Sequence, residues 1–126
     1  MVDLKARPFY LNDEDIAWVQ KTLAEMNTEE KAGQLFCVLL KNDSQETMDY
    51  VFRLMNPGGF MYRIMPTQNA VNASREVVRR SKIYPLIAAN LEKGGNGIVE
   101  EGTLVGSPLE IAATDDVAMV EKMAKV

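Results

Sequence analysis

The stretch PLIAANLEKGG, residues 85–95, decides the fold class, because an apolar run of strand length ends at Asn90 and glycines follow it. An earlier apolar run at 35–40 and a largely apolar strand candidate at 60–64 are of similar length. Runs without polar alternation are typical of parallel strands covered on both faces. The three runs begin near residues 35, 59 and 85, about 25 residues apart, which indicates a repeated unit.

Helical patterns separate these runs. Apolar residues recur at three- and four-residue spacing over 13–26, 48–55 and 66–81, and a last helix is expected after Thr114. Strands that alternate with helices in this way indicate βαβ units and a parallel sheet. The sequence therefore predicts an α/β fold.

Cap residues and burial follow from the same patterns. Thr28 and Thr114 are the expected N-caps of short helices, and Asp43 with Glu46 resembles a capping pair. Cys37 lies inside an apolar run, so we expect it to be a small buried core residue. Since it is the single cysteine, it has no partner for an internal disulfide. The residues expected to face inward are Ile16, Val19, Leu23, Met26, Met48, Val51, Phe52, Met55, Ala70, Val71, Ser74, Val77, Val78, Val117, Val120 and Ala124.

The size of the sheet indicates an incomplete unit. Three strands would leave long apolar edges, which natural domains avoid. A closed barrel of alternating strands and helices has eight strands and about 250 residues, whereas this chain has 126. The last helical pattern also still runs at Val126. We therefore expect residues 1–126 to form part of a (β/α)8 TIM barrel, about three strands with flanking helices.

Composition excludes several functions. The net charge of −4 gives no basic footprint for nucleic acid. The absence of histidine removes the commonest metal ligand and general base, and with it any Ser-His-Asp or Cys-His site. No apolar stretch approaches the roughly 20 residues of a membrane helix, and no signal peptide is visible. Cytoplasmic location is the default expectation, although a leader could be missing from this sequence.

Three segments, taken together, carry a resemblance to a known family. They are MNTEEKAGQL at 26–35, PGGFMY at 57–62, and PLIAANLEKGG at 85–95 followed by Ser107-Pro108 and Ala112-Ala113-Thr114. Their order and spacing resemble those of family-three glycoside hydrolases over nearly the whole chain. The resemblance implies that residues 1–126 are the N-terminal part of that family's barrel domain.

The resemblance also implies an activity and its substrate. Members of the family hydrolyse β-linked sugars, such as β-glucosides or β-N-acetylglucosaminides, with retention of configuration. Retaining hydrolysis uses a carboxylate nucleophile and a general acid roughly 5 Å apart. In the family, the nucleophilic Asp lies on a late strand, and the acid/base comes from a later loop or a following domain. No residue of this chain can inherit either catalytic role, so the isolated chain is expected to be inactive.

Three residues are candidates for contacts with a carbohydrate substrate. Asn90 occupies the position where most family members have an Asp that accepts hydrogen bonds from sugar hydroxyls, and an amide both accepts and donates them. It could instead be a loop-forming residue. Glu92, behind the same strand, could contact substrate or be a solvated acid paired with Lys93. Arg63, at the end of the second strand, could reach the same edge or form a structural ion pair.

The glycine run Gly94-Gly95-Asn96-Gly97 has two interpretations. Its backbone amides could bind a phosphate, or it could be a turn that lets the backbone pass close to the barrel mouth. The run fits neither the dinucleotide pattern nor a P-loop. The sequence therefore predicts no cofactor and no metal site.

A function from another class stays open. The chain could be a small non-catalytic α/β module that binds a ligand or associates with itself. Such a module would have to complete its three-stranded sheet through the open edges, as a homo-oligomer.

Overall fold

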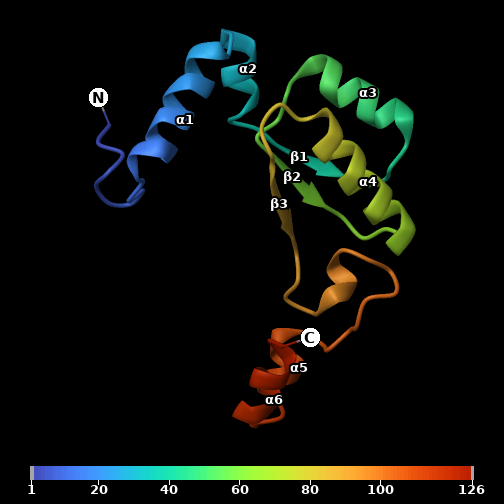
Figure 1. Cartoon of the computed structure of the whole chain (residues 1–126). Coiled ribbons are helices and arrows are strands. Elements are labelled where there is room, and N and C mark those ends of the chain that lie inside the picture. Colours follow the sequence, from blue (N-terminus) through green and yellow to red (C-terminus); the bar gives the residue numbers. More distant parts are fainter. Residues whose placement is uncertain (1, 126) are drawn as a thin grey trace.

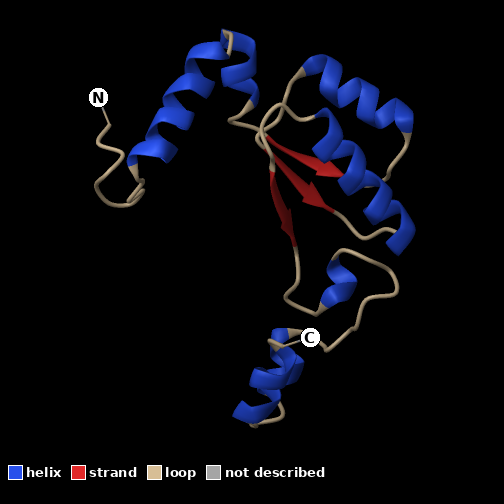
Figure 2. Ribbon diagram, in the orientation of Figure 1, coloured by secondary structure: helices blue, strands red, loops and turns tan. Residues whose placement is uncertain are grey.

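The computed structural model describes residues 2–125 and contains a three-stranded parallel sheet with helices around it (Figures 1 and 2). The expectation drawn from Val126 lies outside the described residues. In chain order the elements are α1 (Asp13–Glu25), α2 (Thr28–Gly33), β1 (Cys37–Leu40), α3 (Gln45–Leu54), β2 (Gly59–Tyr62), α4 (Thr67–Arg80), β3 (Leu86–Ala89), the 3-10 helix η1 (Gly95–Gly97), α5 (Pro108–Ala112) and α6 (Val117–Met123).

The sheet confirms the predicted fold class. The strands lie in the order β1-β2-β3 and all pairs are parallel. Gly59 of β2 is in register with Cys37 on one side and Leu86 on the other. Parallel neighbours need a crossover connection, and α3 and α4 supply the two crossovers. The chain is therefore built of βαβ units, as a part of a TIM barrel is.

One face of the sheet carries the hydrophobic core, because α3 and α4 cover it (Figure 1). Phe60 lies fully buried there, and its ring centroid is 5.9 Å from that of Phe52 on α3. Side chains alternate along a strand, so every second residue of β2 faces these helices. The core residues are Leu40, Met48, Val51, Phe60, Tyr62, Ala73 and Val77.

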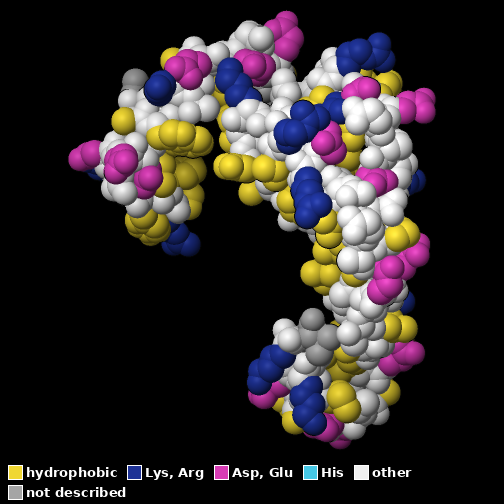
Figure 3. Space-filling view, turned by 45° about the vertical axis from the view of Figure 1, so that its right-hand side comes forward, with side chains coloured by type: hydrophobic (Ala, Val, Ile, Leu, Met, Phe, Trp, Pro, Cys, Tyr) yellow, Lys and Arg dark blue, Asp and Glu magenta, His cyan; other side chains and the backbone are white. Residues whose placement is uncertain are grey.

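The opposite face of the sheet is open. Leu39 is in register with Met61 and Ala88, and its side chain is 54% exposed, whereas that of Leu86 is 81% exposed. Figure 3 shows hydrophobic side chains along the hollow side of the molecule. The expectation that Cys37 is buried is wrong, because Cys37 is exposed on this uncovered face.

The N-cap of α2 differs from the prediction. Asn27, not Thr28, is the cap, and its side-chain oxygen accepts from the Glu30 amide at 2.8 Å. Glu30 returns the bond by accepting from the Asn27 amide at 2.9 Å. This reciprocal pair satisfies two helix-end donors, which a cap at the next residue would not do.

The predicted capping pair at the start of α3 is also wrong. Ser44 is the N-cap, and its hydroxyl accepts from the Thr47 amide at 3.2 Å. The carboxylate of Asp43 is used elsewhere, because it accepts from the side-chain amides of Asn69 at 2.8 Å and Asn72 at 3.0 Å. Asp43 therefore ties the loop after β1 to α4.

The segment after the glycine run holds two short helices where the sequence predicted a loop and one helix. Asp116, not Thr114, caps α6, and its side chain accepts from the Ala118 amide at 2.9 Å. The hydroxyl of Thr114 donates to the Ile111 carbonyl at 2.7 Å. Thr114 therefore closes α5 instead of opening α6.

Several residues that the helical stripes placed inside are exposed. On α4, Val71 and Val78 are 37% and 43% exposed, while Ala73, which the stripe omitted, is fully buried. On α6, Val117 and Val120 are exposed as well. Periodicity identifies an apolar face, but a residue on that face is buried only where a neighbouring element covers it.

The remaining helices lie at the two ends of the sheet. In Figure 1, α1 and α2 lie where the strands begin, and α5 and α6 follow beyond the end of β3. Lys82 holds α2 near the start of β3, since its ammonium group is 3.3 Å from the Glu30 carboxylate. No helix within residues 2–125 has the length and apolarity that a bilayer crossing needs.

Candidate functional site

The three predicted site residues lie at one hollow of about 420 Å³ at the carboxyl edge of the sheet. Arg63 directly follows β2, and Asn90 directly follows β3 with Glu92 two residues on. The carboxyl ends of parallel strands meet at one edge, where barrel enzymes place their functional side chains. Strand topology therefore brings together residues that are 27 positions apart in the sequence.

Asn90 and Glu92 form a hydrogen-bonded pair within this hollow. The side-chain amide of Asn90 donates to the carboxylate of Glu92 at 3.2 Å. The backbone amide of Glu92 itself, the Asn90 side chain and the charges of Lys93 and Arg63 together lower the pKa of the Glu92 carboxyl. Glu92 is therefore an ionised acceptor at neutral pH, and such an acid is poorly suited to donate a proton in catalysis.

The interpretation of Glu92 as an acid paired with Lys93 is corrected in part. Its hydrogen-bond partner in the structure is Asn90, and Lys93 acts on the carboxylate through its charge. Lys93 also lines the hollow, together with Ile64 and two residues of η1. The sequence did not point to these residues as part of the site, although Ile64 directly follows Arg63 and Lys93 directly follows Glu92 in the chain.

The donor and acceptor set of the hollow suits a polyhydroxylated ligand. Glu92 offers acceptor oxygens, Arg63 and Lys93 offer charged donors, and Asn90 offers both kinds of group. All four side chains are solvent-exposed, so the hollow can be entered from water. Glu92 is the single carboxylate that lines it, so the hollow by itself lacks the carboxylate pair of a retaining glycosidase.

The glycine run forms the wall of the hollow next to Asn90. A Cβ added at Gly97 would stand 1.5 Å from the carbonyl oxygen of Asn90, so the two backbones are in direct contact. Gly94 adopts φ 116°, a conformation that favours glycine. The structure therefore supports the interpretation of this run as a close-packing turn.

A phosphate site in the glycine run has little support. The amide of Gly94 donates to Leu91, that of Asn96 to Thr103 and that of Gly97 to Gly94, all to backbone carbonyls. Amides that are already paired inside the loop cannot also surround an anion. Among residues 2–125, no group of three or more Cys, Asp or Glu side chains is placed to hold a metal ion.

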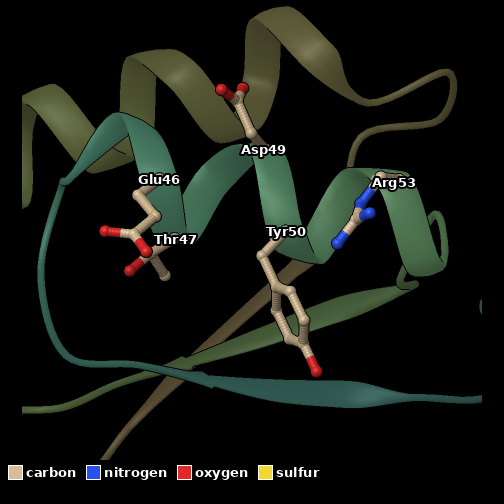
Figure 4. Close-up of a pocket in the computed structure, with 5 residues that line it drawn as sticks. All are labelled: Glu46, Thr47, Asp49, Tyr50 and Arg53. Atoms are coloured by element: carbon tan, nitrogen blue, oxygen red, sulfur yellow. The ribbon is translucent and has the colours of Figure 1, made fainter.

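A larger hollow, about 810 Å³, lies beside α3 and is lined by Glu46, Thr47, Asp49, Tyr50 and Arg53 (Figure 4). All five residues come from one helix, so no second element supplies an opposing wall. None of them lies at the carboxyl ends of the strands. We therefore place the candidate site at the smaller hollow, where two strands and a loop converge.

Comparison with known proteins agrees with the motifs in the sequence. No family model matches the chain. A β-N-acetylglucosaminidase/β-glucosidase of Cellulomonas fimi is 41% identical over all 126 residues, which correspond to 22% of that protein. A β-glucoside phosphorylase, BglX bound to 2FGlc, superposes with a TM-score of 0.81 at 37% identity, over 98% of this chain and 22% of that one.

A second structure of the β-glucoside phosphorylase BglX superposes with a TM-score of 0.70 at 39% identity, over 90% of this chain. The chain thus spans about a fifth of the length of the proteins that it matches. Sequence and backbone agree over almost all of that fifth. The resemblance of this chain to one segment of the family-three glycoside hydrolases, first indicated by its motifs, is therefore confirmed.

Proposed function

We propose that this chain is part of an enzyme that cleaves β-glycosidic bonds and that its hollow binds the hydroxyl groups of the sugar. One observation carries the proposal: Arg63, Asn90 and Glu92 converge at the carboxyl edge of the sheet. Relatives that act on β-glucosides or β-N-acetylglucosaminides share the sequence and the backbone. The substrate class is therefore a β-linked glucoside or N-acetylglucosaminide.

The hollow would orient the sugar rather than react with it. The ionised Glu92 accepts hydrogen bonds from hydroxyl groups, and the Asn90 amide can bridge between a hydroxyl and that carboxylate. Arg63 donates from the carboxyl end of the neighbouring strand β2. Cleavage needs a nucleophile and a proton donor, and we assign both to the part of the relatives that this chain does not span.

The group that accepts the glycosyl unit is left open by these contacts. The Cellulomonas fimi relative is named a glucosidase, whereas the solved structures are named phosphorylases. Hydrolysis transfers the sugar to water and phosphorolysis transfers it to phosphate. In both reactions the sugar hydroxyls have to be bound by hydrogen bonds, so the proposed role of the hollow does not depend on which acceptor is used.

Binding of a sugar to the complete chain tests the proposal. Glucose and N-acetylglucosamine are titrated into the ¹⁵N-labelled 126-residue protein, with Asn90→Ala and Glu92→Ala as site variants. Glu46→Ala, on α3, is a matched control. We expect shifts at 63–64 and 90–97 that both site variants weaken at least about fivefold, since each removes a hydrogen bond to a hydroxyl. Shifts confined to other residues contradict the proposal.

The open face of the sheet favours a second candidate function, self-association without catalysis. Leu39 and Leu86 expose apolar surface beside the unpaired edges of β1 and β3. Size-exclusion chromatography at several concentrations distinguishes the candidates when it is combined with the sugar titration. Concentration-dependent association without any response to sugar favours the module, whereas a sugar response at 90–97 favours the enzyme part.

A further inference from the structure

Glu101 caps a helix to which it does not belong. Its carboxylate accepts from the Thr67 backbone amide at 2.9 Å and from the Thr67 hydroxyl at 2.6 Å, across 34 positions of sequence. Pro66, the N-cap residue of α4, makes no side-chain cap bond. Glu101 therefore supplies the missing cap, and these hydrogen bonds also lower the pKa of its carboxyl.

A backbone bridge fastens the same loop to Met65, in the connection between β2 and α4. The amide of Met65 donates to the carbonyl of Ile98 at 3.1 Å, and the amide of Glu100 donates back to the carbonyl of Met65 at 3.0 Å. Met65 is 2% exposed, so this bridge lies in a closely packed place. Together with the Glu101 cap, it attaches the loop to the β2–α4 connection and to the first turn of α4.

Loop 94–102 is in close backbone contact with the candidate site. Gly97 packs against the carbonyl of Asn90, and Gly102 packs against Gly95 so closely that a Cβ would stand 2.3 Å from its carbonyl carbon. The loop has little space in which to shift as a whole. A continuous set of backbone contacts therefore joins the loop at Gly102 through η1 to the backbone of Asn90.

We propose that Glu101 is a positioning residue for the sugar-binding hollow: it caps α4 through Thr67, fixes loop 94–102, and so holds Asn90 through the contact with Gly97. The inference rests on the proposed function in one respect, namely that the ligand of Asn90 is a sugar. The fixing of the loop itself is independent of that function. Relatives of this chain that need the same hollow are expected to hold this loop from α4.

Amide hydrogen exchange and a glucose titration, both on the full 126-residue chain, test the proposal. The variants are Glu101→Ala and Glu101→Gln. The control is Glu100→Ala, a neighbouring carboxylate whose side chain makes no hydrogen bond or ion pair within the described chain. In Glu101→Ala, exchange at Thr67 and at the amide of Glu100 should rise about tenfold, the usual effect of losing a cap. Affinity for glucose should fall about threefold or more.

The conservative variant separates positioning from a general loss of structure. Glu101→Gln keeps an acceptor oxygen for Thr67, so it should restore most of the exchange protection and glucose affinity. Thr67→Ala keeps the hydrogen bond from the backbone amide to Glu101 and removes the one from the hydroxyl. It should therefore raise exchange and weaken glucose binding less than Glu101→Ala does. Amides of β2, such as that of Phe60, report any global unfolding. Unchanged exchange in Glu101→Ala overturns the proposal. Where the unsubstituted chain binds glucose, raised exchange with an unchanged glucose affinity overturns it as well.

A failure of the proposed function is distinguishable from a failure of this inference. If the unsubstituted chain does not respond to glucose, the sugar-binding role is lost. The side-chain amide resonances of Asn90 then report its position directly. A shift of those resonances in Glu101→Ala, absent in Glu100→Ala, still supports positioning, whereas resonances that stay in place overturn it.

Discussion

Arg80 of α4 donates a hydrogen bond from its Nη1 to the Oδ1 of Asp49 on α3, at 2.7 Å, and so joins the two helices that cover the sheet. Its Nε donates to the Glu76 carboxylate at 3.0 Å. The Arg80 side chain is 15% exposed, and its guanidinium carbon lies 5.9 Å from the ring centroid of Phe52. This cation therefore bridges the polar surface and the edge of the core.

The Glu76 carboxylate makes folding stability depend on pH. Hydrogen bonds from Arg79 and then from Arg80 lower its pKa from 4.5 to about 2. Because this pKa is depressed in the folded state, the contribution is fully present above pH 4.5 and is lost as the pH falls toward 2. In thermal unfolding, Glu76→Gln should therefore be less stable than the unsubstituted chain at pH 7, and the difference should shrink as the pH falls from 4.5 and vanish as it falls through 2.

Glu100→Gln is the control for this measurement, because Glu100 lies outside the helices and strands and its side chain makes no ion pair within residues 2–125. Its stability should follow that of the unsubstituted chain at every pH. A difference between Glu76→Gln and the unsubstituted chain that stays constant from pH 7 to pH 2 would contradict the role of the ionised carboxylate.

Removal of the Phe60 ring should unfold much of the chain. Phe60 is fully buried between the sheet and the helices, and Phe→Ala substitutions in cores cost about 3–5 kcal/mol. Urea unfolding followed by circular dichroism measures the loss. Tyr50→Ala, an aromatic residue that is 57% exposed on α3, should cost less than about 1 kcal/mol. Equal decreases in the free energy of unfolding in the two variants would contradict the assignment of Phe60 to the core.

Two glycines of η1 offer a matched test of the site. In Gly97→Ala the new methyl group would collide with the carbonyl of Asn90, so the backbone at Asn90 must move. In Gly95→Ala the nearest atom lies 3.7 Å away, an ordinary contact. Gly97→Ala should weaken the response to glucose about tenfold or more, and Gly95→Ala should leave it within about twofold. If Gly95→Ala weakened the response to glucose more than Gly97→Ala did, Asn90 would have no part in sugar binding.

The chain by itself should not cleave glycosides. Glu92 is the single carboxylate at the hollow, and its lowered pKa suits a hydrogen-bond acceptor rather than a proton donor. Purified protein is incubated with nitrophenyl β-glucoside and nitrophenyl β-N-acetylglucosaminide, with and without phosphate. Release of nitrophenol at the rate of the buffer blank is the expected result. Turnover that Glu92→Gln abolishes would show that this chain holds a catalytic residue.

The fold could be predicted from the sequence where local pattern and tertiary environment agree. Strand β3 lies within the predicted run that ends at Asn90, β1 lies within the predicted run 35–40, and β2 overlaps the predicted run 60–64 but begins one residue earlier. The prediction failed where burial depends on a neighbour. Cys37 lies in a sound strand pattern yet is exposed, because periodicity locates an apolar face without showing whether another element covers it.

The convergence of the site residues could be predicted from topology, since ends of adjacent parallel strands must meet. The individual side-chain hydrogen bonds could not be predicted from the sequence. The carboxylate of Glu101 reaches Thr67 across a loop whose course depends on glycine packing, and composition does not encode such a course. The Ser44 cap was missed for a related reason: Asp43 is an equally good cap by type, but Asn69 and Asn72 engage its side chain.

A crystal structure of the 126-residue protein with glucose tests most directly the claim that this strand-end hollow holds a sugar. The predicted result is glucose at the hollow, with its hydroxyl groups within hydrogen-bonding distance of the Asn90 amide and the Glu92 carboxylate. Glucose bound reproducibly at another place, such as the hollow beside α3, with the strand-end hollow holding water alone, would contradict it.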